Sequence, residues 1–147
     1  MSAEAFIDTN VFIYHLDAGD RRKQGIAERI VRNGLATGNA CISFQVVQEC
    51  LNTVLRKAQI ALDIKAARAY LDTVLAPLLQ VAPSAALYHR ALDVQERYRF
   101  SFYDSLIVAA ALAAGCNQLL SEHMQDGQRI EGLTVRNPFI QPSSLRR

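Results

Sequence analysis

Residues 5–11 read AFIDTNV, and this short stretch decides the fold class. Ala5, Phe6 and Ile7 are three consecutive apolar residues that predict a short buried strand. Asp8 ends that strand, and a helical pattern begins almost at once, around Asn10. A buried strand that passes directly into a helix is typical of a parallel sheet covered by helices.

The same alternation continues outward along the chain. Further short apolar strands are predicted at 40–42, 79–81, 118–121 and 133–135. Helices are predicted around 10–16, 21–36, 44–57, 63–76, 84–98 and 101–114. We therefore expect an α/β protein with three layers, α/β/α, around a mostly parallel sheet of four to five short strands. No repeat or long linker divides the sequence, which predicts a single domain over residues 1–147.

The composition excludes several classes of protein. Half of the 147 residues are hydrophobic and 20% are charged, which excludes a disordered chain. The apolar run 106–114 is about half the ~20 residues needed to span a bilayer, and no signal peptide is visible. The three Cys residues form no CxxC pair, which favours reduced thiols. We expect a cytoplasmic protein without a membrane partner.

The charge balance alone does not identify a partner. The 16 basic and 14 acidic residues give a net charge of +2. Thirteen of the 16 basic residues are Arg, which binds phosphate in a bidentate way, although a GC-rich genome produces the same bias. The basic clusters at 21–23, 56–57 and 97–99 are candidate RNA contacts, with a solvated helix face as the alternative for each.

Acidic side chains gather where the predicted strands end. Asp8 follows the first strand, Glu49 lies six residues beyond the second, and Asp104 begins the helix that leads into the fourth. Ligands bind at the carboxyl ends of parallel strands, and clustered carboxylates repel one another unless a cation binds. The hard oxygen ligands suit Mg²⁺ or Mn²⁺, which predicts a metal site.

Each acid also has a purely structural interpretation. Asp8 could cap the helix that follows it, and Asp104 could complete a capping box that begins at Ser101. Glu49 shares a helix face with Gln45, Asn52 and Arg56, which also fits a solvated stripe. The metal hypothesis therefore depends on all three acids lying at the same edge of the predicted sheet, and not on any one of them.

Five segments of the sequence form a series of motifs: Ile7–Val11, Ser43–Glu49, Tyr103–Ala111, Leu119–Gly127 and Asn137–Phe139. In these motifs the chain resembles the PIN-domain ribonucleases. The order of the motifs covers nearly the whole chain, and the first and third are the most specific. Within this family the sequence resembles most the VapC-type toxins of bacterial toxin–antitoxin pairs.

The resemblance implies a PIN fold and a metal-dependent endoribonuclease that uses Mg²⁺ or Mn²⁺. It assigns Asp8, Glu49 and Asp104 to the metal pocket and to catalysis. Thr9 and Asn10 would support that pocket, and Ser121 takes the Ser/Thr position of the fourth motif. It also implies an RNA substrate, a cognate antitoxin and a homodimer.

One position departs from the family pattern. The fourth acid of the family falls two residues after the Ser or Thr, where this chain has His123. Glu122 and Asp126 flank that position, and either could replace the missing acid as a metal ligand. His123 could itself be a ligand, although imidazole suits softer metals than Mg²⁺, or it could lie in a surface loop.

Two other functions stay open on the sequence. A catalytically weak or inactive module that binds RNA or protein is the first, because of His123. A phosphatase on a similar sheet is the second, although Asn10 stands where such enzymes carry a second Asp. No GxGxxG or GxSxG motif occurs, which disfavours dinucleotide binding and serine hydrolysis.

Overall fold

The fold is built around β1 (Ala5–Ile7), the strand predicted from the opening motif. The computed structural model describes residues 3–140. The strand order in its six-stranded sheet is β3-β2-β1-β4-β6-β5, and only the β5–β6 pair is antiparallel. The other strands are β2 (Ala40–Ser43), β3 (Leu79–Val81), β4 (Gln118–Leu120), β5 (Arg129–Ile130) and β6 (Leu133–Arg136).

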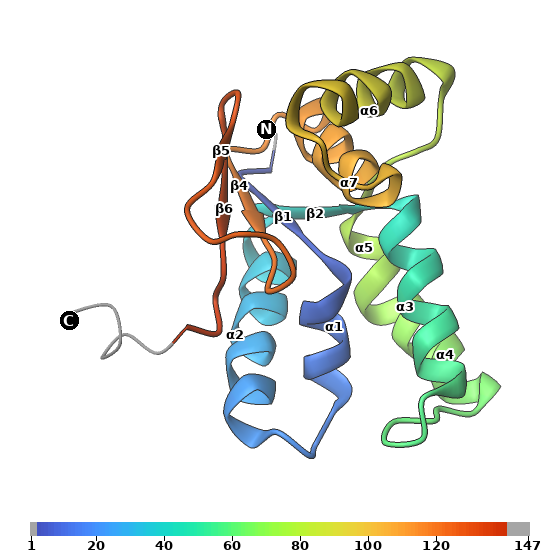
Figure 1. The fold of residues 1–147 in the computed structure, drawn as a ribbon. Coiled ribbons are helices and arrows are strands. Elements are labelled where there is room, and N and C mark those ends of the chain that lie inside the picture. Colours follow the sequence, from blue (N-terminus) through green and yellow to red (C-terminus); the bar gives the residue numbers. More distant parts are fainter. Residues whose placement is uncertain (1–2, 141–147) are drawn as a thin grey trace.

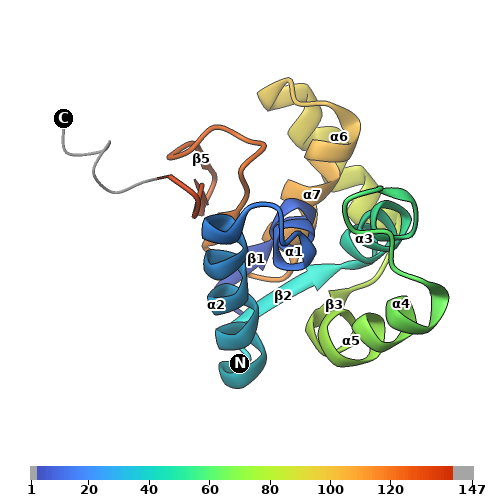
Figure 2. The same cartoon turned by 90° about the horizontal axis from the view of Figure 1, so that it is seen from below.

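Helices cover both faces of this sheet and confirm the predicted three layers. Figure 1 shows α6 and α7 on one side of the sheet and α1, α2 and the α3–α5 group on the other. Figure 2, seen from below, shows α1 and α2 beside one another, next to β1 and β2. The helices are α1 (Thr9–Leu16), α2 (Arg21–Thr37), α3 (Phe44–Arg56), α4 (Ile64–Tyr70), α5 (Ala76–Leu78), α6 (Ala85–Tyr98) and α7 (Phe102–Ala113).

Side-chain caps fix where most helices begin. Asp20 accepts a hydrogen bond from the Lys23 amide at the start of α2, and Ser84 accepts one from the Leu87 amide at the start of α6. Ser43 precedes α3 without a side-chain cap hydrogen bond. Gly38 ends α2 with φ of 73°, a left-handed conformation that Gly adopts without strain.

Two details of the prediction need correction. The sheet has six strands rather than four to five, because β5 is only two residues long and so short a segment carries no detectable alternation. The helix predicted over 63–76 is three segments, with π-helical residues Leu71–Leu75 (η1) between α4 and α5. Pro77, in the first turn of α5, has no N–H to donate to the preceding turn, and the helix widens before it.

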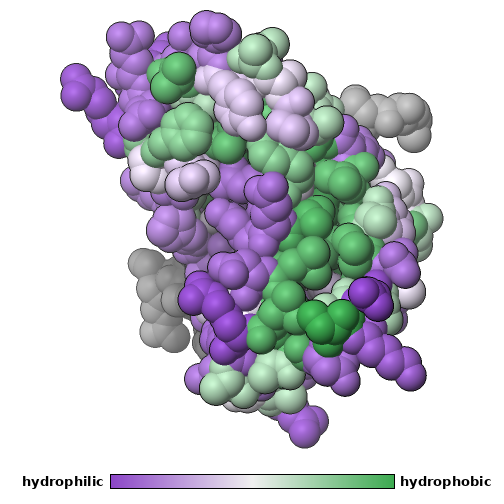
Figure 3. All heavy atoms as spheres, turned by 90° about the vertical axis from the view of Figure 1, so that its right-hand side faces the viewer, coloured by the Kyte–Doolittle hydropathy of each residue, from purple (hydrophilic) through white to green (hydrophobic). Residues whose placement is uncertain are grey.

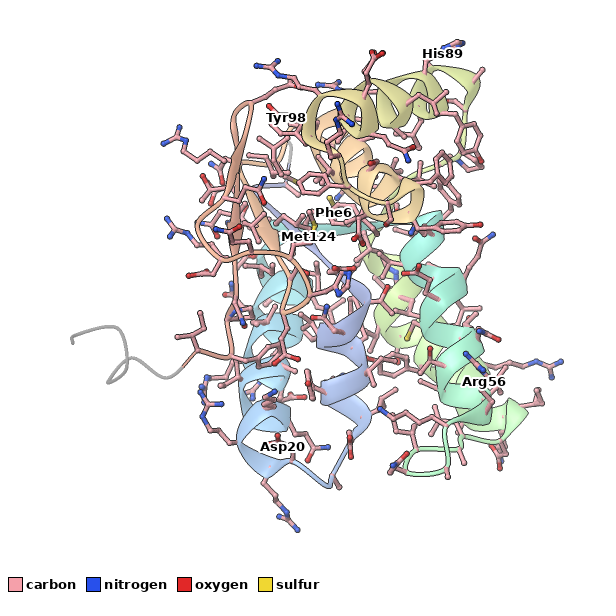
Figure 4. The ribbon with its side chains drawn as sticks, in the orientation of Figure 1. Phe6, Asp20, Arg56, His89, Tyr98 and Met124 are labelled. Atoms are coloured by element: carbon pink, nitrogen blue, oxygen red, sulfur yellow. The ribbon has the colours of Figure 1, made fainter. Side chains whose placement is uncertain are left out.

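The core lies where α2 and α7 sandwich the central strands. Phe6, Ile7 and Leu119 are fully buried, and Figure 4 shows Phe6 and Met124 in the middle of the molecule. Gly34 lets α2 approach β2 closely, because a Cβ at this position would lie 2.8 Å from the Ala40 Cβ. The three cysteines are buried and free, as the sequence predicted: Cys41, Cys50 and Cys116.

The topology of the sheet places a candidate site at its carboxyl edge. The chain leaves β1 to form β2 on one side and returns to form β4 on the other, so the strand order reverses at β1. Side chains that follow β1, β2 and β4 therefore meet at one edge, where open α/β sheets bind ligands. Among the described helices, none is long and apolar enough to cross a membrane.

Candidate metal and nuclease site

Asp8 is the buried acid at the centre of this edge, with 7% of its surface exposed. Its Oδ1 accepts a hydrogen bond from the Thr9 amide at 2.8 Å, and its Oδ2 accepts one from the Ser121 hydroxyl at 2.7 Å. Burial raises the pKa of Asp8, the two hydrogen bonds lower it, and the charges of Glu49 and Asp104 raise it again; the net shift is upward. Asp8 caps α1, as the structural interpretation predicted, and it lines one cavity with Glu49 and Asp104.

Glu49 reaches the site from α3 through two hydrogen bonds. The Thr9 hydroxyl donates to Glu49 Oε1 at 2.6 Å, and the Gln45 amide group donates to Oε2 at 3.1 Å. Gln45 also donates to the Tyr103 carbonyl at 3.1 Å, which ties α3 to the start of α7. The face of α3 that carries Glu49 therefore points into the site and is not simply a solvated stripe.

Asp104 comes from the first turn of α7, and its partner is the residue that departs from the family pattern. His123 Nε2 lies 3.1 Å from Asp104 Oδ2. The Asp104 amide donates to Ser101 Oγ at 3.2 Å, so Ser101 caps the helix as the sequence indicated. The His123 amide donates to Ser121 Oγ at 3.1 Å, and this same hydroxyl donates to Asp8.

These side chains line one open cavity of about 370 Å³. Its nine lining residues are Asp8, Thr9, Asn10, Ile13, Gln45, Glu49, Asp104, Ile107 and His123. The structure thus brings together the three acids that the sequence singled out from β1, α3 and α7. Figure 3, which views the right-hand side of Figure 1, shows an area of hydrophilic residues next to a hydrophobic band.

The two flanking acids of the fourth motif do not line the cavity. Glu122 accepts hydrogen bonds from Lys23 Nζ at 2.6 Å and from the Tyr14 hydroxyl at 2.5 Å. Its backbone amide donates to Asn10 Oδ1 at 3.3 Å, so Asn10 anchors the loop. Asp126 accepts from the Asn137 amide at 2.8 Å, away from the other acids.

Glu122 belongs to a network that fixes the loop 121–124, which we call the loop network. Lys23 lies over the Tyr14 ring at 4.6 Å from its centroid, and Tyr14 packs edge-on against Phe139 at 4.8 Å. Arg22 donates to the Phe139 carbonyl at 2.5 Å. Two side chains of the basic cluster 21–23 thus make contacts within the protein. By contrast, Figure 4 shows Arg56 pointing outward at the far end of α3.

Gln45 is the site residue whose role the sequence did not reveal. It is 3% exposed and lines the cavity, and its Oε1 has no hydrogen-bond partner among residues 3–140. A buried amide oxygen without a hydrogen-bond partner lowers the stability of the fold, and such an atom in a native structure needs an explanation. The available signal was its position one helical turn before Glu49, which puts both side chains on one face.

The donor atoms of the cavity suit a hard divalent cation. Within the described part of the chain, no three His, Cys, Asp or Glu side chains are already arranged as a metal-binding group. The cavity nevertheless offers three carboxylates, and the charges of Glu49 and Asp104 add to the burial that raises the pKa of Asp8. By the chemistry of its donors, the site fits Mg²⁺ or Mn²⁺.

A comparison with protein families identifies the fold. The profile of the family described as "PIN domain" matches residues 5–122, which is most of the chain and includes all three acids. The chain belongs to the PIN-domain family. The resemblance inferred from the motifs is thereby confirmed, and the six-stranded sheet with its layers of helices is a PIN fold.

Solved structures with this PIN fold include bacterial toxins. A toxin–antitoxin complex from Klebsiella pneumoniae has 21% identity and a TM-score of 0.62, over 92% of this chain and 98% of that one. VapBC2 from Rickettsia felis, bound to promoter DNA, has 18% identity and a TM-score of 0.62, over 90% and 97% of the two chains.

A third solved structure that shares the fold is a toxin described by what it cleaves. VapC20 from Mycobacterium tuberculosis, a sarcin–ricin-loop-cleaving toxin, has 24% identity and a TM-score of 0.59, over 85% of this chain and 92% of that one. At these identities the likeness establishes the shared PIN fold. No match was found among curated proteins.

Proposed function

We propose that this PIN-domain protein is a metal-dependent endoribonuclease and the toxin of a type II toxin–antitoxin pair. The observation that carries the proposal is the convergence of Asp8, Glu49 and Asp104 on one open cavity. The solved toxins that share the fold support it, including the toxin described as cleaving the sarcin–ricin loop.

In this proposal, hydrogen bonds from neighbouring residues hold the carboxylates in position. Ser121 and the Thr9 amide hold both oxygens of Asp8, and the Thr9 hydroxyl holds Glu49. Asp8, Glu49 and Asp104 would hold Mg²⁺ or Mn²⁺, which when bound neutralises charge on a phosphodiester and makes a water molecule more acidic. Because the cavity is open, a phosphate of an RNA strand can approach these carboxylates from solvent.

The first test is cleavage of RNA by the purified protein. We expect cleavage with Mg²⁺ or Mn²⁺ and none with excess EDTA. Asp104→Asn should lower kcat/KM roughly 100-fold, which corresponds to about 2.7 kcal/mol of transition-state stabilisation. Asp93→Asn, which removes an exposed carboxylate on α6, is the matched control and should cleave at the normal rate. Equal cleavage by all three proteins, or cleavage in EDTA, would contradict the proposal.

A second candidate is a module that binds RNA without cleaving it. The observation that favours it is His123, which occupies the position of the family's fourth acid and contacts Asp104. Such a module would bind RNA equally well with and without metal. Electrophoretic mobility shifts in EDTA and in Mg²⁺, beside the cleavage assay, separate the two functions.

We also propose a homodimer that forms through the apolar side of α3 and α4. Leu55 is 42% exposed and Ile64 is 56% exposed, and Val47 and Leu51 extend the same surface. Figure 3 shows a continuous hydrophobic band on the side of the molecule that carries these helices. An apolar patch of this kind on a protein surface is typical of a protein–protein interface.

Sedimentation tests this dimer. The wild type is expected to sediment as a dimer at micromolar concentration, and Ile64→Lys should weaken dimerisation at least tenfold because it places a charge in the interface. Leu92→Lys is the control, since Leu92 is similarly exposed, at 52%, but lies on α6. A monomeric wild type, or two variants with the same dimer affinity, would contradict the proposed surface.

The proposed partner of the toxin is an antitoxin. Two of the solved structures that share the fold are toxin–antitoxin assemblies, which supports this partner. Co-purification with the small protein encoded by the adjacent gene tests it.

A further inference from the structure

The imidazole of His123 lies in the cavity beside Asp104. Its Nε2 lies 3.1 Å from Asp104 Oδ2, and the ring lines the same cavity as Asp8 and Glu49. Its backbone is fixed, because its amide donates to the Ser121 hydroxyl that also holds Asp8. The ring itself is 65% exposed, so it can turn without displacing the core.

The spacing of the two donor atoms suits a shared cation. Two neighbouring ligands of an octahedral ion, each about 2.1–2.2 Å from it, lie about 3 Å apart. The 3.1 Å between His123 Nε2 and Asp104 Oδ2 matches that edge. The pair can therefore exchange its hydrogen bond for two bonds to one ion with little movement.

The rest of the cavity supplies oxygen and lacks a fourth carboxylate. Gln45 is 97% buried and lines this cavity, and its Oε1 has no hydrogen-bond partner within residues 3–140. Glu122 is bonded to Lys23 and Tyr14, and Asp126 to the Asn137 amide. His123 is therefore the donor that the fourth motif contributes to the cavity.

We propose that His123 is a nitrogen ligand of the cation in this site and that it makes the site prefer Mn²⁺ over Mg²⁺. Imidazole binds first-row transition ions well, whereas Mg²⁺ prefers oxygen ligands and retains its water. A neutral imidazole in place of a carboxylate also removes one negative charge, which weakens the purely electrostatic attraction of Mg²⁺. This inference rests on the proposed function only in assuming that the cavity binds a cation.

Equilibrium binding of Mn²⁺ tests the ligand without any enzyme assay. Electron paramagnetic resonance of the Mn²⁺ titration, with Mg²⁺ as competitor, gives the ratio of the two dissociation constants. Electron spin-echo envelope modulation detects a directly bound ¹⁴N nucleus. The proteins are the wild type, His123→Asp, His123→Ala, and His89→Ala as a control that removes an exposed imidazole on α6.

We expect the ¹⁴N signal in the wild type and in His89→Ala, and its loss in both His123 variants. The preference for Mn²⁺ over Mg²⁺ should fall roughly tenfold in His123→Asp. Circular dichroism melting curves confirm that each variant is folded. The inference is overturned if the wild type binds Mn²⁺ without a ¹⁴N signal, if it binds no Mn²⁺, or if His123→Asp keeps the wild-type preference.

The cleavage assay keeps this inference distinct from the proposed function. A wild type that shows the ¹⁴N signal but leaves RNA intact would overturn the nuclease proposal and support the ligand. A wild type that cleaves RNA without the ¹⁴N signal would overturn the ligand and support the nuclease.

Discussion

Replacing Asp8 by Asn is expected to abolish RNA cleavage and, in the absence of metal, to stabilise the fold. The loss of activity should reach roughly 1,000-fold in kcat/KM, about 4 kcal/mol, because Asp8 is the central buried carboxylate of the site. Asn keeps the shape of the side chain, can still accept from the Thr9 amide, and can donate to Ser121 Oγ.

The stabilisation follows from the raised pKa of Asp8. Burial is the largest cause, so the folded state binds the proton of this carboxyl more tightly than the unfolded chain does. The stability that protonated Asp8 contributes is fully present below its ordinary pKa of 3.8 and is lost as the pH rises through the higher pKa of the folded state. Near neutral pH the wild type therefore carries the cost of a buried charge, which the Asn variant lacks.

Thermal melts in EDTA measure this difference. The variant should melt roughly 2–4 °C above the wild type, the change that about 1 kcal/mol produces in a chain of this size. Saturating Mn²⁺ should reverse the order, since a ligand at 100 times its Kd stabilises the wild type by about 2.7 kcal/mol. A variant that is less stable than the wild type in EDTA would refute the idea that the charge of Asp8 strains the metal-free fold.

Phe6→Ala is expected to cause the largest loss of stability. Phe6 is fully buried at the centre of β1, between Cys41 of β2 and Leu119 of β4. Truncation of a buried aromatic side chain removes its contacts and leaves a cavity, at a cost of about 3–5 kcal/mol. Because total stabilities of domains are about 5–15 kcal/mol, much of the folded state's advantage would be lost.

Urea denaturation followed by circular dichroism gives the free energy of unfolding. Leu92→Ala is the matched control, because Leu92 is 52% exposed and its truncation should cost less than about 0.5 kcal/mol. The result would contradict the role of β1 if the two variants lost equal stability. A loss confined to Phe6→Ala would show that β1, the strand that leads to Asp8, contributes strongly to the free energy of unfolding.

Local patterns predicted the fold well because strands and helices have different periods. The motif at 5–11 placed β1 and α1, and the helical patterns over 21–36 and 84–98 placed α2 and α6. The π-helical segment and β5 were not predicted, because one depends on how the chain accommodates Pro77 and the other on pairing with β6. Pairing between strands is a tertiary property and leaves little trace in two residues.

The site could be predicted in part for a similar reason. The places of Asp8, Glu49 and Asp104 relative to the predicted strands singled out all three acids, and these three line the cavity. The partners of Glu122 could not be predicted, since Tyr14 and Lys23 lie 108 and 99 residues away along the chain. Helical periodicity shows that Glu49 and Gln45 share a face, but not which way that face points.

The loop network has a consequence for how the protein opens locally. Lys23 in the first turn of α2 and Tyr14 in the last turn of α1 both contact Glu122, and Phe139 packs against the same group of side chains. Segments linked in this way open together in native-state fluctuations. Amide protons of residues 121–124 should therefore exchange with solvent in step with those at the start of α2, so that the loop beside the acids behaves as part of one cooperative unit.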